Sequence, residues 1–558
     1  MADNTTYEKD AAVKNGVKRL VFIGLGVLLE ILVIMGTVWW VAEYAEWIAI
    51  VQRFLAAIVV LLIYNHGSSA DMKMPWIMLI MAMPVMGVTT YLLIGMDGST
   101  RKMRERYQKI DNQLLPLLKQ SEEVQQAVEE CNPGAAGVCT YLRENAGFPV
   151  YGHTKITYYD DALKGLEAQK EDLEKAEQFI FMEYHAIEDS RAWRGIEDIL
   201  VRKAKEGVEV RVFYDDMGSI GFVDTDFAKK LSAKGISCRV FNQLTWGLNI
   251  FLNNRDHRKI TVIDGKVGFT GGYNLADEYF HMKEAYGFWK DTGIRMEGDA
   301  VRSLTVLFLE MWNAIHEDEE DMQRAADYLH MEEAEEAKRP SETLQKPTEE
   351  AAGQPSKTGQ EQTAEEAADA GRPQKAFGYV QPYADSPMNG LRVGEDVYIS
   401  LIEQARRYVW FITPYLIITE DMIRAMGLAA MRGVDVRVIT PGVPDKKMVY
   451  QLTRSYYHSL AEHGVRVYEY TPGFCHAKMC LSDDRVATCG TINLDYRSLY
   501  HHFENGCLFM NCDAVQDMRA DFEATMKECR EVTEEYRDGR GALLKISQLI
   551  LRLFAPLM

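Results

Sequence analysis

The chain has 558 residues, a length that allows two large domains in addition to tails and linkers. Its formal net charge is -20, and the segment from 317 to 370 alone has 17 Asp and Glu against 5 Lys and Arg. A chain this acidic lacks the dense basic side chains that hold a nucleic-acid backbone, which argues against a nucleic-acid-binding protein. Its nine Cys residues show no C-x-x-C spacing. They therefore predict free thiols in a reducing compartment, without a disulfide framework or a zinc site.

Two long apolar runs near the N-terminus predict membrane helices. Residues 20–41 hold one ionisable side chain, Glu30, and residues 75–94 form a second run that includes Pro84. Residues 47–64 are apolar but interrupted by Gln52 and Arg53, so two or three crossings are both compatible with the pattern. Basic residues flank both ends of this region, which predicts an even number of spans with the large domains in the cytoplasm. Glu30 is either a functional group or a carboxylate paired with a neighbouring helix.

The rest of the chain contains a repeat. Residues 207–212 and 433–438 have nearly the same sequence, each a short alternating strand entered from a helix that ends near a Gly. His257 and His476 follow these strands, and from each His a Lys, an Asp and an Asn fall at the same offsets of 2, 7 and 17 residues. Strands that alternate with helices in this way predict two similar α/β halves packed together.

Composition divides the whole chain into seven segments. Residues 317–375 have almost no large apolar side chains, which predicts a disordered acidic insertion that acts as a linker or as a docking arm. Residues 541–558 predict an amphipathic helix, lying on the membrane or packed on the body. The expected segments are a cytoplasmic tail (1–19), a transmembrane region (20–95), a connecting helix (96–140), a first half (141–316), the insertion (317–375), a second half (376–540) and the C-terminal helix (541–558).

The two His motifs predict phosphodiester chemistry. In a strand, residues i and i+2 point to the same face, so His257 with Lys259, and His476 with Lys478, would project together. Phosphorus is attacked in line with the leaving oxygen, so one group is needed on each side of it. One imidazole can attack to form a phosphohistidine, while the other protonates the leaving alcohol and later accepts a proton from the incoming hydroxyl. This reaction needs neither a metal nor a cofactor.

Other side chains near the motifs have expected supporting roles. The Lys ammoniums and the amides of Asn274 and Asn493 can hold the non-bridging phosphate oxygens. Asp264 and Asp483 complete the two motifs, and each is interpreted as a structural residue that closes the turn after its strand. Two carboxylates are candidates for orienting the imidazoles: Asp291 for the His of the first half and Glu504 for the His of the second half.

The two motifs match the H-x-K-x-x-x-x-D signature of the phospholipase D superfamily. The chain resembles bacterial cardiolipin synthases in particular, from residue 19 to the C-terminus except in the acidic insertion. The passages that carry this resemblance are 254–259, 271–274, 289–292, 413–415, 490–498 and the N-terminal apolar segments with Pro75, Trp76 and Pro84.

This resemblance implies two phospholipase D-like α/β sandwich halves in one bilobed catalytic unit, preceded by a transmembrane helical region. It also implies a bacterial plasma-membrane phosphatidyltransferase that condenses two phosphatidylglycerol molecules to cardiolipin and glycerol. It favours His257 as the nucleophile and His476 as the general acid and base.

Several alternatives stay open on the sequence alone. The same residues would serve a phospholipase D, in which water resolves the intermediate, or a phosphatidylserine synthase with serine as the acceptor. A membrane scaffold with a degenerate cleft is disfavoured because both motifs are intact, and a nuclease is disfavoured by the apolar segments and the acidic charge. The expected partners are phospholipids and the bilayer, and a homo-oligomer is compatible with the sequence.

Overall fold

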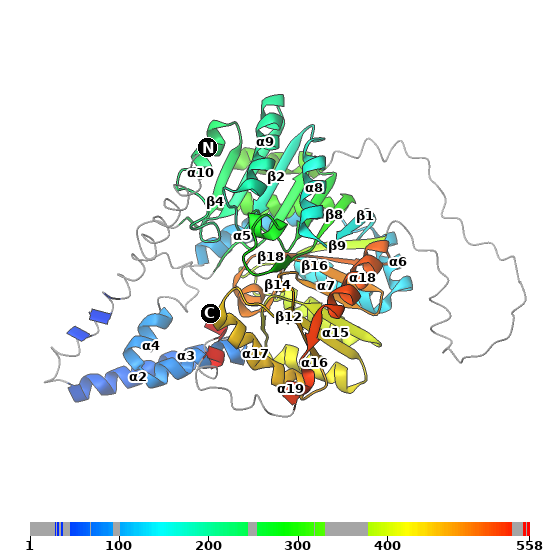
Figure 1. Cartoon of the computed structure of the whole chain (residues 1–558). Helices are drawn as coiled ribbons and strands as arrows, with labels where there is room; N and C mark the ends of the chain where they lie inside the picture. The colour runs from blue at the N-terminus through cyan, green and yellow to red at the C-terminus, as the bar shows by residue number, and fades with distance from the viewer. Residues whose placement is uncertain are drawn as a thin grey trace, which may run out of the picture.

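The structure is a computed structural model that describes residues 28, 31–32, 35–36, 45–66, 69–92, 101–243, 254–316, 318–329, 378–537, 551–553 and 555–557. Its centre is one mixed sheet of 15 strands, in the order β19-β13-β12-β10-β15-β16-β18-β9-β1-β8-β6-β5-β2-β3-β4. The sheet runs through both halves of the chain, and helices cover its faces (Figure 1). The prediction of two similar α/β halves is confirmed.

The first half contributes seven strands to this sheet and the second half eight: seven are in equivalent order in both halves, and β19 (Cys529–Glu531) is an additional edge strand of the second half. The first half contains β1 (Tyr151–Tyr159), α8 (Ala162–Leu173), β2 (Phe179–Tyr184), α9 (Arg191–Glu206), β3 (Glu209–Asp215), α10 (Phe227–Ala233), β4 (Ser237–Phe241), β5 (Lys259–Ile263), β6 (Val267–Gly271), β8 (Gly293–Gly298) and α11 (Val301–Ile315). The second contains β9 (Gly378–Asp385), α15 (Val393–Gln404), β10 (Tyr408–Ile412), α16 (Glu420–Met431), β12 (Asp435–Pro441), α17 (Lys447–Ala461), β13 (Arg466–Tyr470), β15 (Met479–Ser482), β16 (Val486–Gly490), β18 (Glu504–Met510) and α18 (Asp513–Lys527).

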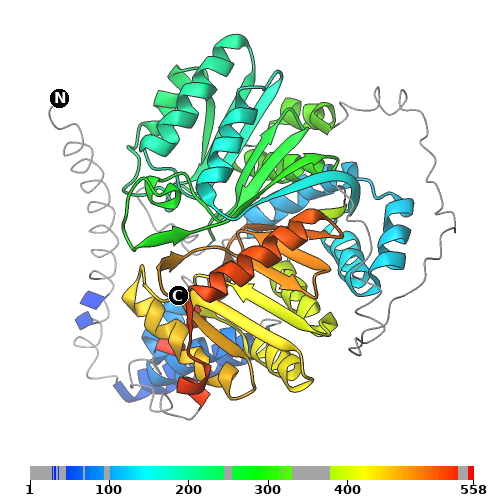
Figure 2. The same ribbon diagram turned by 45° about the vertical axis from the view of Figure 1, so that its right-hand side comes forward.

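The two halves meet at the antiparallel pair of β1 and β9, so each half has the same strand order outward from this centre. In each half three strands are parallel, β2-β3-β4 and β10-β12-β13, and the central one is entered from a helix that ends at a Gly. Gly207 and Gly433 take the left-handed conformation there, with φ of 97° and 93°. The two lobes lie one above the other in Figure 2.

Shorter elements complete the architecture. Four short strands of the described residues lie outside the main sheet, in two pairs. One pair, β7 (Phe288–Lys290) and β14 (Gly473–Cys475), connects the two halves. The remaining short elements are β11 (Leu416–Ile417), β17 (Leu494–Asp495), β19 (Cys529–Glu531), α19 (Thr533–Arg537) and single helical turns at Asp277–Phe280 and Arg497–His501. Before the first half, the segment expected as one connecting helix contains α5 (Arg101–Leu114), α6 (Glu122–Cys131) and α7 (Pro133–Ala146).

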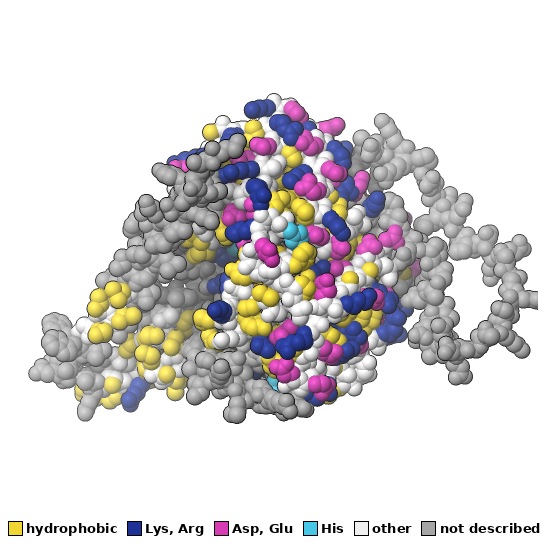
Figure 3. All heavy atoms as spheres, viewed as in Figure 1, with side chains coloured by type: hydrophobic (Ala, Val, Ile, Leu, Met, Phe, Trp, Pro, Cys, Tyr) yellow, Lys and Arg dark blue, Asp and Glu magenta, His cyan; other side chains and the backbone are white. Residues whose placement is uncertain are grey.

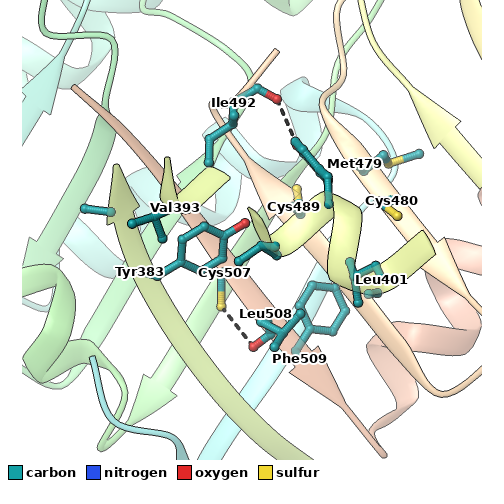
Figure 4. Close-up of a cluster of buried hydrophobic side chains, with 14 of the residues drawn as sticks. Tyr383, Val393, Leu401, Met479, Cys480, Cys489, Ile492, Cys507, Leu508 and Phe509 are labelled. Atoms are coloured by element: carbon teal, nitrogen blue, oxygen red, sulfur yellow. Dashed lines mark hydrogen bonds between the residues drawn. The ribbon is translucent and has the colours of Figure 1, made fainter. Parts of the chain in front are cut away.

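Fully buried side chains fill the space between the sheet and its helices. In the second half, Val393 and Leu401 of α15 pack on Met479, Cys480 and other side chains of the sheet (Figure 4). All nine Cys are free thiols, as predicted. This close packing fixes the ends of the strands at which the motif residues lie.

The apolar N-terminal region forms helices α2 (Ala45–Asn65), α3 (Ala70–Ala82) and α4 (Pro84–Thr90). Most of the first predicted span, 20–41, lies outside the described residues. The second predicted span, 75–94, is not one helix, because α3 ends at Ala82 and α4 begins at Pro84. Within the described ranges, none of the helices is both long enough and apolar enough to span a bilayer.

This region exposes many apolar side chains, and the start of α3 contacts the second half. Yellow side chains gather over α2–α4 in Figure 3, and the most exposed of them include Trp47, Phe54 and Leu61. The Asp71 carboxylate at the start of α3 accepts hydrogen bonds from the Tyr496 hydroxyl (3.1 Å) and from the Glu420 backbone N–H (3.3 Å). These contacts attach the apolar helices to the second half.

The start of the predicted acidic insertion is ordered, so the expectation of disorder from residue 317 is wrong for α12 (Glu319–Leu329). Asp321 of this helix is buried and accepts two hydrogen bonds from the Arg211 guanidinium of β3. The other residues of the insertion, 330–375, lie outside the described residues.

Most of the predicted C-terminal helix also lies outside the described residues. In the described part, Arg552 stacks over the Tyr456 ring, and Ala555 is buried against the body.

Candidate active site

Both motif His residues lie just before the strand that carries the rest of the motif. β5 begins at Lys259, two residues after His257, and β15 begins at Met479, three residues after His476. Both imidazoles are nearly buried, with 8% and 7% of the residue surface exposed. Each His is therefore held at the end of a core strand and not on an exposed sheet face.

Backbone pairing between the halves determines what faces each imidazole. Asp256 forms a parallel bridge with Phe503, and the His257 N–H donates to the Phe503 carbonyl (2.8 Å). In the same way β14 pairs with β7, and the His476 N–H donates to the Lys290 carbonyl (2.7 Å). The residue after each bridge on the partner strand is a carboxylate. The fold thus places Glu504 of the second half beside His257, and Asp291 of the first half beside His476.

The carboxylate contacts cross between the halves. His257 Nδ1 lies 2.9 Å from both carboxylate oxygens of Glu504, and His476 Nδ1 lies 2.6 Å from Asp291 Oδ2. The expected pairing within each half is therefore wrong, although both predicted carboxylates contact an imidazole. A carboxylate at Nδ1 favours the tautomer with Nδ1–H, and at His257 this leaves the Nε2 lone pair free to react.

The two motif lysines are buried beside the imidazoles. The Lys259 ammonium donates to the His257 carbonyl oxygen (2.6 Å), and Lys478 Nζ lies 3.0 Å from His476 Nε2. Burial lowers the pKa of Lys259 to about 7 and that of Lys478 to about 8, partly opposed by the charges of Glu504 and Asp291. These two cations lower each other's affinity for protons, so a bound anion would stabilise both.

The two imidazoles share one electrostatic environment. Burial lowers the pKa of His257 well below its usual value, and the charges of Lys259, Lys478 and His476 add to this effect. Burial and Lys478 lower the pKa of His476 to about 4, against the opposing effect of Asp291. Both imidazoles are therefore neutral at pH 7 before substrate binds. The charged groups of each motif therefore lie close enough to influence the imidazole of the other.

The predicted phosphate-binding amides occupy equivalent positions with different contacts. Asn274 Oδ1 accepts from the Ala186 N–H (3.2 Å), and its Nδ2 donates to the Tyr279 hydroxyl (2.9 Å). Asn493 is also buried, and its Oδ1 has no hydrogen-bond partner among the described residues. Asn274 is thus fixed by the first half, whereas the side-chain oxygen of Asn493 remains an unused acceptor.

The motif Asp residues lie at the opposite end of their strands from the imidazoles. Asp264 accepts hydrogen bonds of 2.8 Å from the backbone N–H groups of Glu177, Gln178 and Phe179. Asp483 accepts three equivalent bonds, of 2.7 to 2.9 Å, from residues 406–408. Both Asp residues have positive φ, 52° and 55°, as a tight turn after a strand requires. These contacts are structural, the role expected for both residues.

Several side chains around the imidazoles were not predicted from the sequence. The rings of His185 and His502 lie 4.9 Å and 5.5 Å from that of His257. Tyr279 and Trp289 pack at 5.3 Å and 5.4 Å from the His476 ring. The Thr491 hydroxyl donates to Glu504 (2.5 Å). Proximity in sequence to a predicted site residue was the available signal: it marks His502 beside Glu504, Thr491 beside Asn493 and Trp289 beside Asp291.

One group in the cleft has the side chains of a metal site. In the part of the chain that the structure describes, ligand atoms of His257, His502 and Glu504 lie within 4.8 Å of one another. However, the ammoniums of Lys259 and Lys478 act on the same imidazole. Two buried cations beside the ligands disfavour a metal cation and favour an anion such as a phosphodiester.

Comparisons with known proteins agree with this geometry. A family model described as "Cardiolipin synthase, PLD-like domain" matches residues 170–312 and 398–526, one segment in each half. An uncharacterized protein of Streptococcus mutans is 38% identical over 499 residues, which cover 89% of this chain and 99% of that protein. The chain belongs to the cardiolipin synthase family of the phospholipase D superfamily.

Further relatives and a solved structure extend the comparison. Cardiolipin synthase 2 of Bacillus cereus is 29% identical, with 91% of this chain and 90% of that protein covered. A crystal structure of phosphatidylserine synthase from Haemophilus influenzae matches with a TM-score of 0.50 and 13% identity, covering 75% of this chain and 99% of that one. The structural match shows a shared fold and leaves the substrate of this family member to be argued from its site.

Proposed function

We propose that this protein is a cardiolipin synthase, which transfers a phosphatidyl group from one phosphatidylglycerol to another and releases glycerol. The observation that carries the proposal is the crossed pairing of each imidazole with a carboxylate of the other half. Each imidazole stands next to a carboxylate of the other half, and both lie among two buried ammoniums. Family membership and curated relatives that bear the name cardiolipin synthase support the substrate assignment.

The first step forms a covalent intermediate. His257, held by Glu504 with its Nε2 lone pair free, attacks the phosphorus of phosphatidylglycerol. The N–P bond forms as the P–O bond to the headgroup glycerol breaks. His476, in its protonated form, gives a proton to that oxygen, so glycerol leaves as a neutral alcohol. The products of this step are phosphatidyl-His257, neutral His476 and glycerol.

The second step reverses these roles with a new alcohol. Neutral His476 accepts the proton of a headgroup hydroxyl on a second phosphatidylglycerol. The resulting oxygen nucleophile attacks phosphorus opposite the His257 nitrogen, so a P–O bond forms as the N–P bond breaks. Cardiolipin is released, and both imidazoles return to their starting states.

Substrate charge accounts for the protonation state that the first step needs. Before substrate binds, burial and Lys478 keep the pKa of His476 at about 4. A phosphodiester anion between the imidazoles stabilises the imidazolium and offsets the positive charge of the lysines. The ammoniums of Lys259 and Lys478 and the amides of Asn274 and Asn493 hold the non-bridging oxygens in this scheme.

The N-terminal region fits a role in bringing the cleft to a lipid surface. Helices α2–α4 expose large apolar side chains, and α3 is hydrogen-bonded to the second half through Asp71. An apolar surface of this kind favours contact with a bilayer. We assign the protein to the bacterial plasma membrane with both halves on the cytoplasmic side. Donor and acceptor then meet the cleft at high effective concentration.

Purified full-length protein incubated with headgroup- and acyl-labelled phosphatidylglycerol tests this function. The expected products are cardiolipin and free glycerol in equal amounts. Phosphatidic acid as the main product would instead assign a phospholipase D. Phosphatidylserine formed only after serine is added would assign a phosphatidylserine synthase. Either outcome, or no product under conditions where the protein is folded, would overturn the proposal.

A further inference from the structure

A buried network of charged side chains lies directly behind His257. The Arg258 side chain is fully buried, and its Nη1 donates to Glu310 Oε2 (2.8 Å) and to the Leu307 carbonyl (3.2 Å). Asp256, on the other side of His257, accepts the Arg258 backbone N–H at its Oδ1 (3.1 Å). Glu183 of β2 is fully buried beside them, and its pKa responds to the charges of both Asp256 and Arg258.

The network has more carboxylates than cations. The Arg258 guanidinium interacts electrostatically with the carboxyl groups of four residues: Glu183, Asp256, Glu310 and Asp111. Neither Glu183 oxygen, nor Asp256 Oδ2, has a donor among the described residues. Two ionised carboxylates buried together without donors would be strongly unfavourable. One proton shared between Glu183 and Asp256 satisfies both, and burial, with the charge of Asp256, raises the pKa of Glu183 well above its usual value.

Asp256 is the point where this network meets the catalytic imidazole. Its backbone N–H donates to Asp215 Oδ2 (3.1 Å), and its carbonyl oxygen lies 2.6 Å from His185 Nδ1. The next residue in the chain is His257, whose ring packs 4.9 Å from that of His185. A shift of Asp256 therefore moves the His257 ring against Glu504, which belongs to the other half.

The second half lacks this network at the equivalent positions. Glu183 pairs in the sheet with Ile260, the third residue after His257. The third residue after His476 is Met479, and its partner in the sheet is Ile412. The neighbours of His476 in the chain are Cys475 and Ala477, where the first half has Asp256 and Arg258. Lys290, which precedes Asp291, forms a buried ion pair with Asp521 on that side (2.7 Å). The acidic network is thus a specific property of the His257 side.

The network also reaches the helix that follows the apolar N-terminal region. Asp111 of α5 shares a side-chain hydrogen bond with Glu310. Tyr107 of the same helix is fully buried and stacks on Phe503 at 4.9 Å, the residue that bridges to Asp256. Helix α5, which precedes both halves in the chain, therefore packs against the same network.

We infer that Glu183 is a positioning residue for His257, acting through a proton shared with Asp256. The inference rests on the proposed phosphodiester chemistry of the cleft but not on the identity of the lipid acceptor. Glu183 is fully buried in β2, and in this role it fixes the backbone from which the imidazole projects. Disturbing it should lower the turnover rate and leave substrate affinity largely unchanged, since a misplacement of a reacting group by about 1 Å can lower a rate by about 100-fold.

The test compares Glu183→Gln with Glu183→Leu in full-length protein. The Gln amide can donate to Asp256 Oδ2 in place of the shared proton, whereas Leu cannot. We expect Glu183→Leu to lower kcat by about 10- to 100-fold with KM nearly unchanged, and Glu183→Gln to restore kcat to within about threefold of wild type. The substrates are phosphatidylglycerol and bis(p-nitrophenyl) phosphate, a soluble phosphodiester that needs no lipid acceptor.

Asp321→Asn is the matched control, because Asp321 is a buried carboxylate bound to Arg211 in the same half but outside the cleft. It should lower the unfolding temperature and leave kcat near wild type. If Glu183→Leu does not fold, Glu183→Met serves as the variant without a donor. Wild-type kcat in the Leu or Met variant, or an equal loss in Asp321→Asn, would overturn the inference. Wild-type cleavage of the soluble diester without any cardiolipin formation would overturn the proposed function alone.

Discussion

The crossed contacts of the cleft lead to a prediction that separates the two imidazoles. Glu504 holds His257, the proposed nucleophile, and Asp291 holds His476, the proposed acid. A p-nitrophenol leaving group needs no protonation, because it is far more acidic than an alcohol. With bis(p-nitrophenyl) phosphate, variants on the nucleophile side should therefore lose the first step, while variants on the acid side should largely keep it.

The structure gives a magnitude for this loss. Both Glu504 oxygens lie 2.9 Å from His257 Nδ1, and a hydrogen bond to a charged group contributes about 1.5 to 3 kcal/mol. Removing that contribution from the transition state lowers the rate by about 10- to 150-fold. We expect this loss for Glu504→Gln in the burst of p-nitrophenol followed by stopped-flow absorbance. Asp291→Asn should keep the burst within about threefold of wild type.

The same two variants should behave differently with phosphatidylglycerol, whose leaving alcohol does require an acid. There both substitutions should slow cardiolipin formation. The refuting result is a burst that is lost in Asp291→Asn and kept in Glu504→Gln. That pattern would mean that each carboxylate serves the imidazole of its own half, or that the roles of the imidazoles are exchanged; the same assay on His257→Ala and His476→Ala tells these two cases apart.

Three further predictions concern the lysines, the motif Asp residues and metals. The value of kcat/KM should fall as the pH rises through about 7 to 8. Burial lowers the pKa of Lys259 and Lys478 to this range, so both ammoniums lose their charge there. A pH profile that Lys478→Arg leaves unchanged would contradict this prediction. Asp264→Ala should lower the free energy of unfolding by about 2 to 4 kcal/mol in urea titrations, because three backbone N–H groups lose a charged acceptor. An unaltered stability together with an inactive enzyme would instead make Asp264 catalytic. Activity should be the same with and without EDTA, and a rate that collapses on chelation and returns with added metal would show that a metal takes part.

The repeat made much of this architecture predictable from sequence. Two motifs with identical offsets predicted two similar halves and singled out His257 and His476, because ordinary surface residues do not recur in the same order at the same spacing. The turn role of Asp264 also followed from its place at the end of an apolar strand. Local spacing is sufficient for such features, since strand, turn and motif lie within a few residues of one another.

The partner of each imidazole was not predictable in this way. The contact between His257 and Glu504 joins residues 247 positions apart, and that between His476 and Asp291 spans 185. Both depend on how the halves pair through β7, β14 and the Asp256 bridge, and short strands of this kind leave little pattern in a sequence. The placement of each carboxylate beside the imidazole of the other half therefore follows from tertiary pairing and not from local sequence.

Predictions from composition also failed where a single tertiary contact decides the local structure. The acidic composition after residue 317 predicts disorder, yet α12 is fixed because Asp321 pairs with a buried Arg211. In the apolar N-terminal region, Pro84 stands at the start of a new helix and divides a run that hydropathy treats as continuous. Glu183 was not predicted because an acidic residue inside an apolar strand has no motif to mark it.

The most direct test of the central claim is an experimental structure of the protein with orthovanadate, which mimics phosphorus in its five-coordinate state. We predict vanadium bonded to the Nε2 atom of one imidazole, with the other imidazole hydrogen-bonded to the opposite apical oxygen and both lysines on the equatorial oxygens. Vanadate held by one imidazole, with the other turned into a separate pocket, would contradict the claim that both act on one phosphorus atom.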